Sequence, residues 1–410
     1  RLSRRRAQVW GAPHSWGDGF NYCLGHGSAR DAPFPEAIKK LRTKGIVQVA
    51  IGGAHCAALS SSGRVYTWGV GLYGRLGHGD MEDRSQPTLM LASKEEEAMP
   101  VQVACGAMHS ALVTKSGELW TWGMGLYGEL GQGDAHDAWV PTRVLRGGLG
   151  GRLVSAVACG SHFTVALTAA GSTFAWGRGR FGCLGHGDAL DRREPTPVAA
   201  LARDAVVQVA CGPHHVLALR DDGALLGWGR GKGGAHGRGH AQDAPVPGAV
   251  CELGARVVVD MACGRRHSVL LTLRGEVLTW GSGEGFALGA PSEAPRLAPA
   301  RVRAVRRLVV VAVAAGGART AALARGGDLY VWGGLLAGVR DPARLRDAAL
   351  RFAATDLAVP EEGGVRDRGA TRAPGAGVMR ALAAQFPGDP GALLPGARPD
   401  AAPPAVLRAA

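Results

Sequence analysis

The sequence predicts an all-β fold, a β-propeller, on two observations. First, a Trp-Gly pair recurs every 52 to 54 residues, and a Gly stands five positions before each Trp of the series. Second, apolar runs of four to seven residues alternate with Gly turns, and runs of this length form strands rather than helices. Units of three or four strands bury their faces only by stacking around a ring. The anchors are Trp16, Trp68, Trp122, Trp176, Trp228, Trp280 and Trp332.

The strands of each repeat follow in the same order. The segment 101–123, "VQVACGAMHSALVTKSGELWTWG", begins with a β-branched run that ends in small residues and Gly. A second apolar run, a Gly turn and a third run that ends in Trp-Gly come next. A fourth, less regular strand is expected in Pro-containing segments such as "SQPTLML" at 85–91. Each repeat therefore predicts three or four antiparallel strands.

The repeat pattern, "ACGxxH" followed by "WG" and "YGxLGxGD", resembles that of the regulator of chromosome condensation family. The resemblance covers residues 9–334 and implies a seven-bladed β-propeller. The loop motif is intact as "LGHGD" at 76–80 and 184–188, altered to "HGRGH" at 236–240 and lost after Trp332. We therefore expect six clear blades and a partial seventh, which has only the strand that ends at Trp16.

Beyond the repeats, the composition of the chain changes. Residues 1–334 form the predicted propeller domain, and residues 335–410 form a tail rich in Ala, Pro, Gly and Arg. One short helix is predicted in the tail, with Asp341 as its N-cap and an apolar face that reaches Phe352. Because an open ring exposes strand edges, we expect the strand before Trp16 to pair with a C-terminal segment.

Two motifs that resemble ligand sites are better explained by the repeat. Gly123, Gly125 and Gly128 have the G-x-G-x-x-G spacing of dinucleotide-binding loops, but this spacing recurs in four repeats without a following helix. Cys105 and His109 have C-x-x-x-H spacing, but each repeat offers two ligands at most, and zinc needs three or four. We expect no cofactor and no metal, and the turn His residues should hydrogen-bond neighbouring backbone. Without a Ser-His-acid or paired-carboxylate constellation, the chain is predicted not to be an enzyme.

Composition leaves the partner and the compartment open. The net charge of +13 favours a nucleic acid or another acidic partner, but only six of the 47 basic residues are Lys, which indicates a general Arg-rich composition. Four of the eight Cys recur at one repeat position, which indicates packing rather than disulfides and favours a reducing, intracellular compartment. Cytoplasm and nucleus are favoured, and the mitochondrion stays open. No apolar run approaches a membrane span, and the start at Arg1 suits a fragment or a chain that has lost a targeting peptide.

The resemblance implies several functions. Many family members are adaptor or scaffold domains, so we expect a non-enzymatic protein-interaction platform, as a subunit or regulator of a larger assembly. The founding member exchanges guanine nucleotide on a nuclear GTPase through a wedge between blade strands. Exchange on a small GTPase is therefore the alternative, although the regular repeat spacing leaves no obvious room for a wedge. Chromatin or RNA binding through a basic surface is the second alternative. Photoreception, known from a plant ultraviolet-B receptor of the family, is not expected, because Met108 and Arg265 stand where that receptor uses Trp.

The candidate binding surface comes from the repeat register. Positions two and four after each Trp lie in the same inter-strand loop of successive blades, and so on one face of the ring. They are apolar in two adjacent repeats and cationic in the next two. Contiguous exposed apolar residues mark interaction surfaces, and Arg is favoured at interface anchors. We expect this face to bind a partner that presents an apolar side chain beside an acidic stretch. The predicted protein-binding residues are Val70, Leu72, Tyr73, Met124, Leu126, Tyr127, Arg178, Arg180, Arg230 and Lys232.

Overall fold

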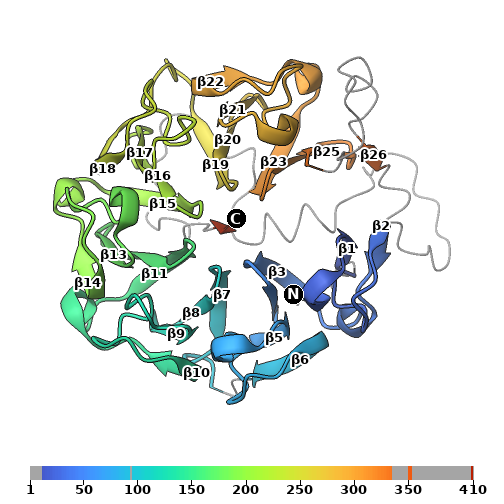
Figure 1. The fold of residues 1–410 in the computed structure, drawn as a ribbon, viewed down its shortest axis with the longest axis vertical. Helices are drawn as coiled ribbons and strands as arrows, with labels where there is room; N and C mark the ends of the chain where they lie inside the picture. The colour runs from blue at the N-terminus through green and yellow to red at the C-terminus, as the bar shows by residue number, and fades with distance from the viewer. Residues whose placement is uncertain (1–11, 93–94, 335–349, 353–407, 410) are drawn as a thin grey trace, which may run out of the picture.

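The computed structural model describes residues 12–92, 95–334, 350–352 and 408–409. In it, six antiparallel sheets stand side by side around a common centre, and each sheet is one blade (Figure 1). Within a blade, the chain runs from the strand nearest the centre to the outermost strand before it enters the next blade. No helix in the described part of the chain is long and apolar enough to cross a membrane. The all-β propeller expected from the repeat is therefore confirmed.

The bounds of the strands repeat closely from blade to blade. Blade 1 comprises β3 (Ile46–Ile51), β4 (His55–Ser60), β5 (Arg64–Gly69) and β6 (Arg84–Ala92). Blade 2 comprises β7 (Pro100–Cys105), β8 (His109–Thr114), β9 (Leu119–Gly123) and β10 (Ala138–Arg143). Blade 3 comprises β11 (Val154–Cys159), β12 (Phe163–Thr168), β13 (Thr173–Gly177) and β14 (Arg192–Pro197). Blade 4 comprises β15 (Val206–Cys211), β16 (His215–Arg220), β17 (Leu225–Gly229) and β18 (Ala244–Ala249). Blade 5 comprises β19 (Val258–Cys263), β20 (His267–Thr272), β21 (Val277–Gly281) and β22 (Arg296–Arg301). Blade 6 comprises β23 (Val310–Gly316), β24 (Arg319–Ala324), β25 (Leu329–Gly333) and β26 (Leu350–Phe352). Short 3-10 helices lie in the connections, namely η1 (Phe20–Tyr22), η2 (Lys39–Leu41), η3 (Leu72–Gly74), η4 (Gly147–Leu149), η5 (Arg180–Gly182), η6 (Ala199–Leu201), η7 (Glu284–Phe286) and η8 (Arg303–Val305).

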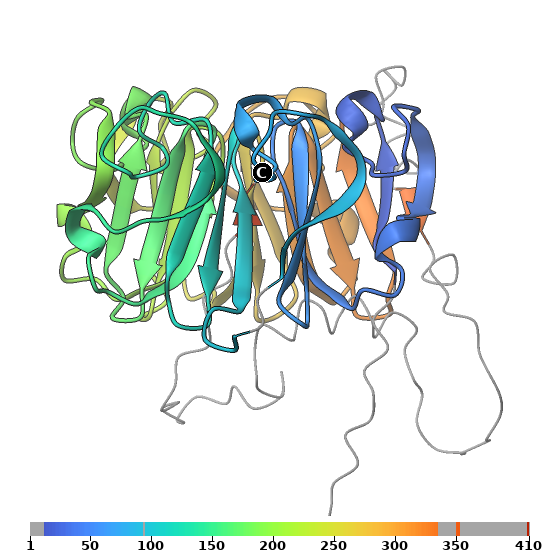
Figure 2. The ribbon, with the colours of Figure 1, turned by 90° about the horizontal axis from the view of Figure 1, so that it is seen from below.

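The antiparallel order of the strands gives the ring two distinct faces (Figure 2). Neighbouring strands run in opposite directions, so successive connections alternate between the two ends of a blade. The turns that join the first strand to the second, and the third to the fourth, lie on what we call the upper face. The hairpins between the second and third strands, and the linkers between blades, lie on the lower face.

At the place expected for the seventh blade, between blades 6 and 1, two strands pair antiparallel: β1 (His14–Gly17) and β2 (Ala32–Ala37). The expectation that only the strand ending at Trp16 would be present is therefore wrong, because β2 is present as well. Among the described strands, the partner of β1 is β2. Blade 6 takes its outermost strand from the tail, because β26 pairs with β25. Six blades are clear, and the expected closure of β1 against a C-terminal segment stays a prediction.

Two short pieces of the tail are described. Phe352 belongs to strand β26, so a helix that begins near Asp341 does not reach this residue. The rest of the predicted helix lies outside the described residues. The strand β27 (Arg408–Ala409) runs parallel to β15 near the centre of the ring (Figure 1).

The anchor Trp residues form the core of the blades, as predicted. From Trp68 to Trp332, the indole Nε1–H of each anchor donates to a backbone carbonyl of the preceding repeat: that of Trp122 reaches Arg75 O at 2.9 Å, and that of Trp176 reaches Glu129 O at 3.0 Å. One hydrogen bond thus fixes each large side chain and joins two blades. The anchors that are at most 1% exposed are Trp68, Trp122, Trp176, Trp228 and Trp280.

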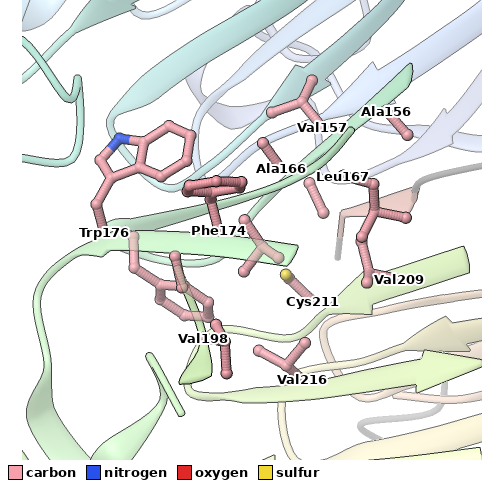
Figure 3. Close-up of a cluster of buried hydrophobic side chains, with 14 of the residues drawn as sticks. Ala156, Val157, Ala166, Leu167, Phe174, Trp176, Val198, Val209, Cys211 and Val216 are labelled. Atoms are coloured by element: carbon pink, nitrogen blue, oxygen red, sulfur yellow. The ribbon is translucent and has the colours of Figure 1, made fainter. Parts of the chain in front are cut away.

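The space between neighbouring blades is filled by apolar side chains. Figure 3 shows the boundary of blades 3 and 4, where Phe174 and Trp176 of β13 belong to one cluster with Val209, Cys211 and Val216. The recurrent Cys residues have the packing role predicted for them, because all four are buried and free. They are Cys105, Cys159, Cys211 and Cys263.

Candidate interaction surface

All ten predicted binding residues lie in the upper loops of blades 1 to 4, between the third and fourth strands. The structure separates them by position. Position four after the Trp is exposed in each of these loops, at Leu72, Leu126, Arg180 and Lys232. The other members, Val70, Tyr73, Tyr127, Arg178 and Arg230, are half-buried. Met124 is 6% exposed, so its expected exposure is wrong.

A backbone hydrogen bond explains why position two is less exposed than position four. The N–H of position two donates to a carbonyl in the first upper turn of its own blade. Val70 N reaches Ala54 O at 2.9 Å, and Met124 N reaches Met108 O at 3.0 Å. This bond holds position two against the turn, whereas position four lies further out along the loop.

The upper loops are held in one shape by their glycines. The N–H of Gly125 donates to Asp137 Oδ1 at 2.9 Å, which joins the two ends of the loop. A Cβ at Gly125 would lie only 1.9 Å from His136 O. Any larger residue would therefore push apart the two backbone segments of the loop that meet at Gly125 and His136. The glycines that resemble a nucleotide-binding fingerprint therefore have a structural role in the loop.

Two aromatic rings of the upper face lie between side chains of the next blade. The Tyr127 ring, from blade 2, has Arg178 Cζ 4.4 Å from its centroid and meets the His162 ring edge-on at 5.3 Å. Arg178 and His162 both belong to blade 3. A guanidinium on an aromatic face is attracted by the ring quadrupole. The contact orients Arg178 and covers Tyr127.

The same arrangement repeats one blade further. The Phe181 ring, from blade 3, has Arg180 Cζ at 4.5 Å and Arg230 Cζ at 4.6 Å from its centroid. His214 of blade 4 meets it edge-on at 5.3 Å. We call the seven residues of these two clusters the aromatic–arginine row: Tyr127, His162, Arg178, Arg180, Phe181, His214 and Arg230.

Three members of the row, His162, Phe181 and His214, were not among the predicted site residues. Phe181 occupies the same repeat position as Tyr73 and Tyr127, so the register contains a signal for it. The two His residues come from the first upper turns of blades 3 and 4, about 35 residues from the rings they contact. No spacing in the sequence connects these partners.

Buried charged side chains support the exposed loops from below. Glu129 is fully buried; its Oε2 accepts the Tyr127 N–H at 2.7 Å, and its Oε1 lies 3.6 Å from His162 Nδ1. Arg75 takes the equivalent place in blade 1, is 2% exposed, and donates from Nε to Leu72 O at 2.8 Å. These contacts fix the loops that present Leu72 and Leu126.

The row carries positive charge without matching carboxylates. Within the described residues, the cations Arg178, Arg180, Arg230 and Lys232 form no ion pair. Burial, together with neighbouring cations of which Arg230 has the largest effect, lowers the pKa of His214 to about 4, so this ring is neutral at pH 7. The upper face of blades 3 and 4 therefore presents free cations beside the apolar side chains of blades 1 and 2.

The described residues include no group of three or more His, Cys, Asp or Glu that could hold a metal ion. Burial raises the pKa of the Cys105 thiol to about 12, so its thiolate is scarce at pH 7. The turn His residues bond hydroxyl groups of the next blade, and the expectation of neighbouring backbone partners is wrong for them. His109 Nε2, for example, lies 3.0 Å from Thr164 Oγ1.

Comparison with known proteins agrees with this geometry. The sequence model of the RCC1-like domain matches residues 12–339. The chain is 39% identical over 292 residues to the ultraviolet-B receptor UVR8 of Arabidopsis thaliana, and the matched region covers 71% of this chain and 66% of the receptor. It is 38% identical over 266 residues to the human E3 ubiquitin-protein ligase HERC2, and the matched region covers 64% of this chain and 5% of the ligase. It is 34% identical to the mitochondrial RCC1 domain-containing protein RUG3 of A. thaliana, over 67% of this chain and 62% of RUG3. The chain thus spans less than two thirds of each of these relatives.

Solved structures share the fold. Human WBSCR16 superposes with a TM-score of 0.69 at 25% identity, over 78% of this chain and 87% of that one. Yeast RCC1 (Prp20), solved with Kap60, superposes with a TM-score of 0.68 at 22% identity, over 81% and 84%. The family match covers blades 1 to 5, strands β23 to β25 of blade 6, and both β1 and β2; β26 lies beyond it. This chain belongs to the RCC1-like domain family of β-propellers.

Proposed function

We propose that this chain is a non-enzymatic protein-interaction module whose upper face binds a partner protein. The observation that carries the proposal is the aromatic–arginine row, whose cations have no carboxylate partner in the described structure and which continues, on the same face, the loops that expose Leu72 in blade 1 and Leu126 in blade 2. The partner that fits this face presents carboxylates beside an apolar side chain. Such a module would act as a subunit or regulator of a larger assembly.

Pre-organisation supports this proposal. Arg178 and Arg230 are half-buried against the Tyr127 and Phe181 rings, and each such contact contributes about 0.5–1 kcal/mol. A guanidinium held in this way loses little freedom when a carboxylate binds it, so more of the interaction energy appears as affinity. Arg180 and Lys232 are exposed and supply charge that attracts an acidic partner.

Nucleotide exchange on a small GTPase is the alternative function. The family resemblance supports it, but the upper loops that the structure describes in full contain no wedge. The loops between the third and fourth strands cover 70–83, 124–137, 178–191, 230–243 and 282–295, and all five have the same length. An inserted wedge would lengthen one of them. The alternative predicts that the purified chain accelerates nucleotide release from a small GTPase.

The proposal is tested by recovery of partners from cells. We would compare the wild-type chain with Arg180→Glu/Lys232→Glu, a variant whose changed side chains are both exposed; of the two, Arg180 also contacts the Phe181 ring. The control is Arg152→Glu/Arg203→Glu, which changes the charge equally at exposed residues of the lower face. Quantitative mass spectrometry should show partners lost from the first variant and kept by the second. Equal recovery by all three proteins would reject the upper face as the binding site.

A further inference from the structure

Three linkers on the lower face form the same turn with different surfaces. They contain η2, η6 and η8, and each turn buries one apolar residue, at Leu41, Leu201 and Val305. The residue before each turn, Ile38, Val198 or Val302, is buried as well. The three turns are closed by the same backbone hydrogen bond, in which the carbonyl oxygen of the first turn residue accepts from the N–H of the residue three positions later, at 3.1–3.3 Å. The three turns are therefore structural equivalents.

The exposed positions of these turns carry different charge. The η6 linker uses alanine at 199, 200 and 202. At the equivalent positions, η2 has Lys39, Lys40 and Arg42, and η8 has Arg303 and Arg306, with Arg307 next to it. All of these cations are exposed. Since alanines make the same turn, the fold does not require the cations of η2 and η8.

Two further arginines surround the η8 linker. Arg325, at the tip of the β24–β25 hairpin, donates its backbone N–H to Val309 O at 2.8 Å. Arg274 is at the tip of the β20–β21 hairpin, where a Cβ on the next residue, Gly275, would lie 3.2 Å from Val310 N. The linker from η8 into β23 thus passes between both hairpin tips.

These cations lack acidic partners. Within the described residues, no ion pair involves any member of the lower basic arc, which we define as Lys39, Lys40, Arg42, Lys44, Arg274, Arg303, Arg306, Arg307 and Arg325. Glu276, at the base of one hairpin, is already shared by Arg256 at 3.6 Å and Arg301 at 3.0 Å. Asp328 is the carboxylate of the other hairpin. The basic residues therefore outnumber the acidic ones strongly in this sector.

Charge is segregated around the lower face. The linker into blade 2 carries Glu95, Glu96 and Glu97, and the β16–β17 hairpin of blade 4 carries Asp221 and Asp222. The basic arc lies instead on the linkers and hairpins next to blades 5, 6 and 1, on both sides of the partial seventh blade (Figure 1). The linkers into blades 3 and 4 also expose arginines, at 146, 152 and 203, so the arc is the sector of this face where cations are most numerous rather than the one place where they occur.

We propose that the lower basic arc is a second binding surface, which takes the sugar-phosphate backbone of a double-stranded nucleic acid. Arginine binds phosphate oxygens through paired N–H groups, and an array of cations along an arc suits a regular array of phosphates. The linkers and hairpin tips that carry the arc, 39–45, 273–276, 303–309 and 325–328, contain no aromatic residue, so they offer no platform for the stacking that unpaired bases use. The surface would read charge and shape rather than sequence, and it is independent of the upper-face proposal.

The test uses fluorescence anisotropy with labelled RNA and DNA duplexes of about 20 base pairs at about 50 and 200 mM KCl. The variant Arg303→Ala/Arg306→Ala/Arg307→Ala takes the alanines that η6 has at its first two changed positions, which keeps the turn, and also removes Arg307, whose equivalent in η6 is Arg203. Its matched control, Arg180→Ala/Lys232→Ala/Arg265→Ala, removes three exposed cations from the upper face. Thermal unfolding of all proteins checks that the fold is kept.

We expect the lower-face variant to lose about tenfold or more in duplex affinity, and the control to bind as wild type. The slope of log K against log salt concentration should become shallower by about 0.9 for each phosphate contact that the variant loses. Equal losses in both variants would show a response to net charge alone and overturn the proposal. Wild-type binding by the lower-face variant would do so too. Tighter binding of poly-glutamate or of single-stranded RNA than of the duplex would reject the assigned ligand.

Discussion

His109 of β8 donates from Nε2 to the hydroxyl of Thr164 in β12, at 3.0 Å and across the boundary of blades 2 and 3. The direction follows from the second bond of that hydroxyl, because Thr164 Oγ1 donates to Glu129 O at 2.8 Å. The same carbonyl accepts the Trp176 indole N–H. A His, a hydroxyl and a Trp thus meet through one carbonyl at the blade boundary. Three other boundaries have the His–hydroxyl pair: His55–Ser110, His215–Ser268 and His267–Thr320.

The boundary of blades 3 and 4 shows what replaces this network. There, the equivalent positions are Phe163 and Val216, and both are buried. A ring that cannot donate is thus matched by a side chain that cannot accept. The two positions behave as a unit, although more than 50 residues separate them in the chain.

The variant Thr164→Val should lower the free energy of unfolding by about 1–3 kcal/mol, because it leaves the buried His109 N–H without an acceptor. The double variant His109→Phe/Thr164→Val, which copies the pair at blades 3 and 4, should cost less than the sum of the two single changes. Urea unfolding of the four proteins forms a double-mutant cycle that measures this coupling. Strict additivity would show that the two residues do not act together.

Acid should destabilise the ring through the same His residues. Burial lowers the pKa of His55, His109 and His215 to about 3 and that of His267 to about 4, from an ordinary 6.5. The unfolded chain takes up protons below pH 6.5 while these folded rings stay neutral, so stability is full above that pH and falls as the pH drops towards 4. Each His contributes at most about 1.4 kcal/mol per pH unit. Unfolding free energies between pH 7 and 4.5 measure the slope, which should be shallower in His109→Phe/Thr164→Val. An identical slope would contradict this origin.

Trp122→Ala should cost on the order of 3–5 kcal/mol, because the indole is fully buried and donates to Arg75 O across a blade boundary. Arg30→Ala, on an exposed side chain, is the control and should change little. Chemical denaturation measures both. Similar stabilities of the two variants would show that the anchor Trp residues do not hold the ring together.

Gly125→Ala should cost on the order of 2–3 kcal/mol, since the new Cβ would lie 1.9 Å from His136 O in the upper loop of blade 2. Gly316→Ala is the matched control, because no atom lies within 4 Å of a Cβ there. The comparison separates the close approach in the loop from the general effect of replacing a glycine. Thermal melts that place both variants at the wild-type value would contradict the structural role of Gly125.

Much of the fold could be predicted because the repeat displays it many times. The Trp period gives the length of each blade and its order in the chain, and the recurrent Cys and Gly mark the innermost strands and the turns. Contacts between blades were harder to predict. Nothing local in the sequence pairs His109 with Thr164, or His162 with Tyr127, because these partners meet only when the ring assembles. Strand β26 lies in an Ala- and Arg-rich tail without strand-like alternation, so the sequence signal favoured a helix there.

The candidate site could be predicted in its location but not in its detail. The repeat register places Leu126 and Met124 in one loop, yet only Leu126 is exposed, because a backbone bond to Met108 draws position two inward. Likewise, Arg178 and Arg230 read as free cations in the sequence, whereas the structure stacks them on rings of the preceding blade. A variant that removes them would disturb those ring contacts as well as the surface charge.

The central claim, that the upper face of blades 1 to 4 binds a protein, is tested most directly by hydrogen–deuterium exchange of the chain with and without a partner recovered from cells. We predict that binding slows exchange in the upper loops at 124–137, 178–191 and 230–243 and leaves the lower-face hairpins at 169–172 and 221–224 unchanged. Protection confined to the lower face, or spread evenly over both faces, would contradict the claim.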